Sequence, residues 1–200
     1  MSSDSLQFWF EFGSTYSHLS AARIEKVAGD AGVRVEWKPF LLGPIFRAQG
    51  WNDSPFNIYP VKGRYMWRDM ERLCAKLEIP FRKPTQFPRN GLLAARIACA
   101  ALEQPWISHF VRLVYHANFA EDRDISQPQV LGDVLAAIGT SAEPWIERAH
   151  SPESKARLRQ HTEEAVQKGI FGAPTFSARE EIFWGNDRLE DAIAWCQRGG

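Results

Sequence analysis

The chain has 200 residues and no excess of charge of either sign. Lys and Arg total 24, as do Asp and Glu, so the formal net charge is zero. No basic stretch supplies the positive field that a phosphate backbone requires, and no long uncharged apolar run is present. The residues before Leu6 also lack the charged and apolar regions of a leader peptide. We therefore expect a cytoplasmic protein with neither nucleic-acid nor membrane partners.

Cysteines are few and poorly placed for cross-linking. Cys74, Cys99 and Cys196 are an odd number, widely spaced and in helical patterns, which disfavours a disulfide framework or a cysteine-rich metal site. We interpret them as buried structural thiols rather than reactive ones. His109 and His116 share a helical face, but no acidic or cysteine ligand joins them at metal spacing, so we expect no metal. Phosphate-binding glycine loops and Gly-x-Ser-x-Gly elbows are also missing.

The first 40 residues predict a strand, a helix and a second strand. Apolar residues alternate along Leu6–Phe12, which is the period of a strand, and Gly13 breaks the pattern. A helical arc of apolar residues then runs from Thr15 to about Gly29. Alternation returns in Val33–Trp37 until Pro39 ends it. Such a β-α-β unit favours parallel strands.

The middle of the chain predicts helices and no convincing strand. Met66, Met70, Leu73 and Leu77 form a stripe at helical spacing. Further helices are expected after Asn90 and over Ile107–Tyr115, Ser126–Ile138 and Pro152–Lys168. We interpret the Met and aromatic stripes as core rather than as a cofactor site.

The end of the chain predicts a hairpin and a helix. Thr175–Ser177 and Ile182–Trp184 flank a polar turn, which indicates an antiparallel pair. The final helix is expected to begin near Asn186, with Asp187 and Glu190 resembling a capping box.

The order β-α-β, helices, β-β-α is an α/β arrangement of the thioredoxin type. It predicts a thioredoxin-like domain made of residues 1–40 and 170–200, with an all-helical domain, residues 41–169, inserted between its halves.

Ser14 is the first candidate for chemistry. It stands at the start of the first helix, where unpaired N–H groups and the helix dipole favour an anion such as a thiolate. A plain N-cap is the alternative. Redox enzymes of this fold carry Cys-x-x-Cys where this chain has Ser14-Thr15-Tyr16-Ser17. The pattern is therefore typical of a protein that handles thiols without a thiol of its own.

Four other residues could hold a ligand. Pro174 precedes a strand, where a cis bond would open the preceding backbone to an extended ligand and a trans bond is the alternative. Asn186 and Asp187 offer a helix start and a carboxylate for the end group of an amino acid, although capping alone also explains them. Lys62, in an expected loop, could neutralise a ligand carboxylate or simply be exposed.

Five segments, in this order along the chain, carry a resemblance to a known family. They are Phe10-Glu11-Phe12-Gly13-Ser14-Thr15-Tyr16-Ser17, Pro60-Val61-Lys62-Gly63-Arg64-Tyr65 followed by Asp69, Phe87-Pro88-Arg89-Asn90, Gly169-Ile170-Phe171-Gly172-Ala173-Pro174-Thr175-Phe176 and Trp184-Gly185-Asn186-Asp187-Arg188-Leu189. Together they resemble the 2-hydroxychromene-2-carboxylate isomerase family, which is similar to kappa-class glutathione transferases and to DsbA. Many members of the family have Pro where this chain has Thr15.

The resemblance implies glutathione as cofactor. Ser14 matches the catalytic serine that hydrogen-bonds the glutathione sulfur and favours its thiolate. Ala173, before a cis-Pro174, matches the residue whose backbone pairs with the cysteinyl part.

The two ends of the tripeptide have their own matches. Asn186 and Asp187 match the residues that hold the γ-glutamyl end. Lys62 matches a lysine that meets the glycyl carboxylate in the kappa relatives, and Asn57, expected in the same loop, would assist.

The implied activity is conversion of 2-hydroxychromene-2-carboxylate, or a related aromatic keto acid, to trans-o-hydroxybenzylidenepyruvate by reversible thiolate addition. The small aromatic keto acid would be the partner molecule, and the family implies a homodimer. A kappa-like glutathione S-transferase and a redox-inactive DsbA-like binding module are the alternatives.

Overall fold

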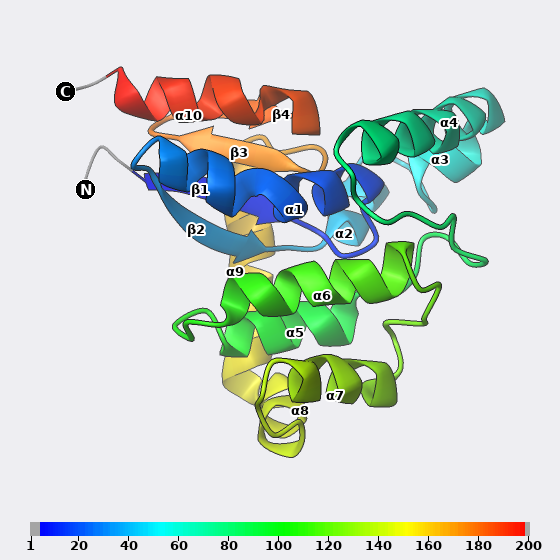
Figure 1. Ribbon diagram of the computed structural model, residues 1–200, viewed down its shortest axis with the longest axis vertical. Coiled ribbons are helices and arrows are strands. Elements are labelled where there is room, and N and C mark those ends of the chain that lie inside the picture. The colour runs from blue at the N-terminus through cyan, green and yellow to red at the C-terminus, as the bar shows by residue number, and fades with distance from the viewer. Residues whose placement is uncertain (1–4, 199–200) are drawn as a thin grey trace.

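A four-stranded mixed sheet forms the centre of the computed structural model, which describes residues 5–198 (Figure 1). The strand order is β2-β1-β3-β4. β1 (Ser5–Phe10) is parallel to β2 (Arg34–Pro39) and antiparallel to β3 (Thr175–Ala178), which pairs with β4 (Glu181–Trp184) in an antiparallel hairpin. The predicted parallel pair and the predicted hairpin are both confirmed.

Helices surround this sheet and fill the long segment between β2 and β3. They are α1 (Thr15–Asp30), α2 (Leu42–Ala48), α3 (Pro55–Ile58), α4 (Pro60–Lys76), α5 (Leu92–Ala100), α6 (Ile107–Phe119), α7 (Pro128–Ala137), α8 (Glu143–Ala149), α9 (Pro152–Gln167), the 3₁₀ turn η1 (Asn186–Arg188) and α10 (Leu189–Gln197). None of those within residues 5–198 is long and apolar enough to cross a membrane.

The alternation along β1 sorts its side chains onto two covered faces. Phe8 and Phe10 lie on the face that packs against α1 and α10, and their stacked rings have centroids 5.2 Å apart. Trp9 points to the other face and packs against Phe40 and Ile45, near α2 and α9. Because both faces are buried, β1 fixes the register of the whole sheet.

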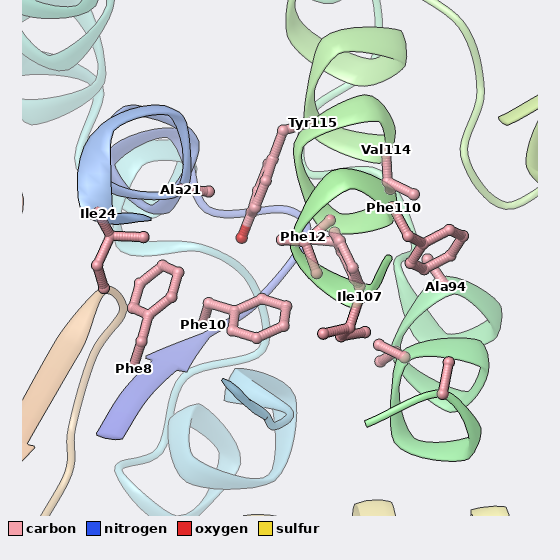
Figure 2. Packing of buried hydrophobic residues seen from close by; sticks show 14 of the residues in the cluster. Phe8, Phe10, Phe12, Ala21, Ile24, Ala94, Ile107, Phe110, Val114 and Tyr115 are labelled. Carbon is pink, nitrogen blue, oxygen red and sulfur yellow. The ribbon is translucent and has the colours of Figure 1, made fainter. Parts of the chain in front are cut away.

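The same core continues into the inserted helices. Figure 2 shows Phe12, just beyond β1, facing Phe110 and Tyr115 of α6. The ring centroids of Phe12 and Tyr115 lie 5.3 Å apart. One cluster of buried hydrophobic residues therefore joins residues 5–40 to the helical segment, and the division into two domains stays a prediction.

Three details differ from the sequence prediction. β1 ends at Phe10 rather than Phe12, because the Glu11 carbonyl accepts the Ser14 N–H at 3.0 Å and turns the chain. The short helices α2, α3 and α8 were not predicted, since pieces of one or two turns show too little periodicity. The capping box at Asp187 was wrong: α10 follows η1 and has no side-chain cap, while Glu190 pairs with Arg23.

Phe8 offers a test of this core. Its ring stacks on Phe10 and Phe176 and meets Trp37 edge-on, so Phe8→Ala leaves a cavity at the centre of the sheet. We expect a loss of about 3–5 kcal/mol in the free energy of unfolding measured with urea. Val166→Ala, at an exposed position of α9, should change it by less than about 0.5 kcal/mol. An equal loss in the two variants would contradict the packing described.

Candidate functional site

Ser14 is the N-cap of α1 and faces a loop far away in sequence. Its backbone is extended, and its Oγ accepts the Ser17 N–H at 3.2 Å. The same Oγ donates to the Ala173 carbonyl at 2.8 Å. The first turn of α1 contains no acidic side chain, so its N–H groups and dipole have no anion of their own within the helix.

The loop opposite Ser14 contains a cis proline. The Ala173–Pro174 peptide bond is cis, and the Pro174 carbonyl accepts the Gly185 N–H at 3.0 Å. Nothing within residues 5–198 accepts the Ala173 N–H. Ser14, Ala173 and the turn that starts at Gly185 therefore meet at one end of the sheet.

Asn186 and Asp187 lie in this turn but point in different ways. Asn186 is buried, and its Oδ1 accepts from Ser20 Oγ at 3.1 Å and from Arg23 Nε at 3.2 Å. Its side chain thus anchors the turn to α1, and the predicted contact with a ligand stays untested. Asp187 is exposed, and its only ion pair within the described residues is with Arg188 at 3.5 Å.

Tyr16 connects this turn to α4. Its hydroxyl donates to Asp69 Oδ2 at 2.9 Å. Burial raises the pKa of Tyr16, and the hydrogen bond to Asp69 and the nearby charge of Asp187 act in the same direction. Because both carboxylates act on one phenol, α4 and the turn containing Asp187 flank the start of α1.

Lys62 and Asn57 were predicted to lie in a loop, but the structure places both in helices. Lys62 lies in the first turn of α4, exposed, with its Nζ 5.1 Å from the centre of the Tyr59 ring. It has no carboxylate partner among residues 5–198. Asn57 lies in α3, and its Nδ2 donates to the Phe87 carbonyl at 3.0 Å. The turn between the helices is tight, because a Cβ on Gly63 would lie 2.2 Å from the Phe56 carbonyl oxygen.

Glu11 is a titratable residue that the sequence reasoning missed. It follows β1, and its Oε2 accepts the Gly13 N–H at 2.9 Å. No Lys, Arg or His within the described residues pairs with it. Burial raises its pKa from 4.5 to about 7, against the lowering effect of the Gly13 hydrogen bond. An acidic residue between a strand and an N-cap was the available signal, and its missing counter-charge was not visible in the sequence.

A group of buried polar side chains lies behind Ser14. Tyr115 of α6 donates its hydroxyl to the Glu11 carbonyl at 2.9 Å. The hydroxyls of Thr15 and Ser17 and the Nε2 of His18 are buried and have no hydrogen-bond partner among the described residues. Burial lowers the pKa of His18 to about 4, so its ring is neutral at physiological pH. This group adds no positive charge near Glu11.

The cysteines lie outside this arrangement. Cys74, Cys99 and Cys196 are all buried and none forms a disulfide within residues 5–198, as expected of structural thiols. Burial raises the pKa of Cys74 to about 11 and that of Cys99 to about 12. In the part of the chain that the structure describes, no group of three or more His, Cys, Asp or Glu could hold a metal.

The site therefore offers hydrogen-bond donors and charges rather than a nucleophile. The hydroxyl of Ser14 and the helix start favour a small anion, such as a thiolate. The Ala173 backbone can pair with an extended ligand, and Lys62 and Asp187 present opposite charges that have no strong partner within residues 5–198.

Comparisons with known proteins give four informative matches. A model of the DSBA-like thioredoxin domain matches residues 5–193. A 2-hydroxychromene-2-carboxylate isomerase of Sphingobium xenophagum is 30% identical over 186 residues, covering 92% of this chain and 94% of the relative. Glutathione S-transferase kappa 1 of Homo sapiens is 27% identical over 199 residues, covering 92% of this chain and 87% of the relative. The solved structure of a 2-hydroxychromene-2-carboxylate isomerase has a TM-score of 0.85 at 24% identity, covering 97% of this chain and 95% of that one.

The raised pKa of Glu11 predicts a pH-dependent stability. The folded chain keeps the proton up to about pH 7, whereas the unfolded chain releases it near pH 4.5, so raising the pH through this interval destabilises the fold. Glu11→Gln keeps an acceptor for Gly13 and removes the titration. Between about pH 5 and pH 8 the variant should gain about 2 kcal/mol in unfolding free energy relative to wild type.

Denaturant unfolding at both pH values measures this difference. Glu163→Gln, at an exposed position of α9, is the control and should differ from wild type equally at the two pH values. If the difference in unfolding free energy between Glu11→Gln and wild type does not change with pH, the pKa of Glu11 is not raised in the folded chain.

Proposed function

Because the chain belongs to the DSBA-like thioredoxin domain family, in the group that includes 2-hydroxychromene-2-carboxylate isomerases and kappa-class glutathione S-transferases, we propose that it is a glutathione-dependent isomerase. Its substrate would be 2-hydroxychromene-2-carboxylate or a related aromatic keto acid. The observation that carries the proposal is the Ser14 hydroxyl, which caps α1 and hydrogen-bonds to the residue before a cis proline.

The residues present suit a glutathione molecule. Its thiol would lie beside Ser14 at the start of α1, and its cysteinyl backbone would pair with Ala173, whose N–H has no acceptor within residues 5–198. Asp187 would hold the ammonium group of the γ-glutamyl end, and Asn186 would fix the turn through its hydrogen bonds to α1. Lys62 would meet the glycyl carboxylate, and Asn57 would hold α3 in place beside it.

The Ser14 hydroxyl has to change its acceptor when a thiolate is present. It now donates to the Ala173 carbonyl, and one O–H cannot also donate to sulfur. Pairing of Ala173 with the cysteinyl N–H would give its carbonyl a new donor. Ser14 would then be free to donate to sulfur, and the thiolate would be favoured over the thiol.

Glutathione, when bound, would supply a thiolate suited to reversible addition to the conjugated double bond of the ring-opened substrate. The chain itself contributes binding and electrostatics. Ser14 and the start of α1 hold a negative charge at sulfur, and Lys62 and Asp187 orient the two ends of the cofactor. Ser14 is not a nucleophile in this scheme.

A kappa-like glutathione S-transferase is the second candidate, supported by the match to the human kappa protein over 92% of this chain. Mass spectrometry separates the two functions, because an isomerase returns an unmodified isomer and a transferase leaves a stable adduct. A homodimer in the cytoplasm and the redox-inactive binding module stay predictions from the sequence.

Ser14→Ala tests the central residue. The variant loses the hydroxyl that donates to sulfur, so we expect turnover of 2-hydroxychromene-2-carboxylate with glutathione to fall about 100-fold or more. Ser141→Ala, at an exposed position, should leave turnover unchanged. Turnover by wild type without glutathione, or wild-type turnover by Ser14→Ala, would refute the proposal.

The charged residues give a test by binding alone. Asp187→Asn and Lys62→Met should each weaken glutathione binding about tenfold in calorimetry, equivalent to about 1.4 kcal/mol. Lys155→Met, at an exposed position of α9, is the control and should bind as wild type does. Unchanged binding by both site variants would show that the ends of the tripeptide lie elsewhere.

A further inference from the structure

We infer that Glu11 is the residue that takes up the proton released when a thiol ionises beside Ser14. The inference rests on the proposed function and concerns a carboxyl group that the scheme above does not use. Glu11 would act in the site as a proton acceptor and would not itself bind glutathione.

The position of the carboxyl group is the first argument. Glu11 lies in the link between β1 and α1, and its carbonyl accepts the Ser14 N–H at 3.0 Å. Its Oε2 accepts the N–H of Gly13, the neighbour of Ser14, at 2.9 Å. A Cβ on Gly13 would lie 3.1 Å from Oε2, and one on Gly91 would lie 3.5 Å from Oε1. The carboxyl group is therefore held between two glycines at the start of α1.

The second argument is that one oxygen is left for a proton. No donor within residues 5–198 reaches Oε1, whereas Oε2 already has the Gly13 N–H. A carboxylate without a counter-charge in a partly buried place favours its neutral form. The raised pKa of Glu11, about 7, is the expected consequence.

The groups around Glu11 do not replace a counter-charge. From α6, Tyr115 donates its hydroxyl to the Glu11 carbonyl and is itself neutral. From the segment before α5, Arg89 directs its guanidinium to Asn118 and Asp122. From α1, His18 is neutral near pH 7. Ser14 and Ser17, on the same helix, carry no charge.

A thiolate beside Ser14 would be a second negative charge at the same helix start. Two like charges at one helix start oppose each other, so the pair would titrate together and Glu11 would become protonated as the sulfur ionises. In this step the S–H bond breaks, its electron pair stays on sulfur, and a new O–H bond forms on Glu11 Oε1. In the molecules whose Glu11 is ionised beforehand, the thiol proton then stays in the site instead of passing to the solvent.

Proton release during glutathione binding tests this assignment. Calorimetry near pH 7 in two buffers of different ionisation enthalpy counts the protons. Wild type, with Glu11 about half ionised beforehand, should release about half a proton fewer than Glu11→Gln. S-methylglutathione has no thiol proton, so its binding should not show this deficit in wild type.

Three results would overturn the assignment. If wild type and Glu11→Gln bind glutathione normally and release equal numbers of protons, the assignment to Glu11 is overturned and the proposed function still stands. The same deficit with S-methylglutathione would show that the thiol is not the source of the proton. Glutathione that does not bind wild type at all would overturn the proposed function as well.

A second measurement needs no variant. In wild type carrying ¹³C-labelled glutamate carboxyl groups, NMR titration should show the Glu11 midpoint rising by about one pH unit or more when glutathione is bound. A midpoint that stays the same with glutathione would equally overturn the assignment, even if Glu11→Gln failed to fold.

Discussion

The hydrogen bond from Ser14 Oγ to the Ala173 carbonyl joins two segments that are 159 residues apart in sequence. It can form only because β1 and β3 are neighbours in the sheet, which brings the start of α1 beside the cis-proline loop. The same adjacency carries the turn that holds Asp187, since the Pro174 carbonyl binds the Gly185 N–H. The positions of Ser14, Ala173 and Asp187 in the proposed glutathione site therefore depend on this pairing of strands.

The packing around β1 explains why the start of α1 and the cis-proline loop keep their positions. The faces of β1 are both covered, one by α1 and α10 and the other by α2 and α9, so the strand cannot shift its register without exposing aromatic rings. The inserted helices share this core through Phe12 and Tyr115. Tyr115 also hydrogen-bonds to the Glu11 carbonyl, so the helical segment supports the link that leads to Ser14.

The chemistry follows from what the site has and what it omits. The three cysteines of the chain are buried, and burial raises the pKa of Cys74 and Cys99, so the proposed reactive sulfur is that of a ligand. The hydroxyl and the helix start favour a negative charge there, whereas the unpaired carboxyl of Glu11 disfavours a second one. A carboxyl group with a pKa of about 7 beside an anion site is suited to taking up a proton that is released there.

The sequence by itself determined the local elements and the order in which they occur. Alternation along β1, the break at Gly13 and the serine before a helix are short-range signals, so the strand, the turn and the N-cap at Ser14 were predictable. The five ordered motifs likewise predicted the family. These features depend on residues a few positions apart, which is the range over which backbone preferences act.

Only the tertiary structure decided which way the other side chains face and what surrounds them. Asn186 turns inward because Ser20 and Arg23 of α1 supply its donors, and Asp187 gives up a capping role because η1 precedes α10. Burial raises the pKa of Glu11 to about 7, and no cation within residues 5–198 forms an ion pair with it. Burial and the presence of a counter-charge are set by segments far apart in the chain, and no local pattern in the sequence encodes them.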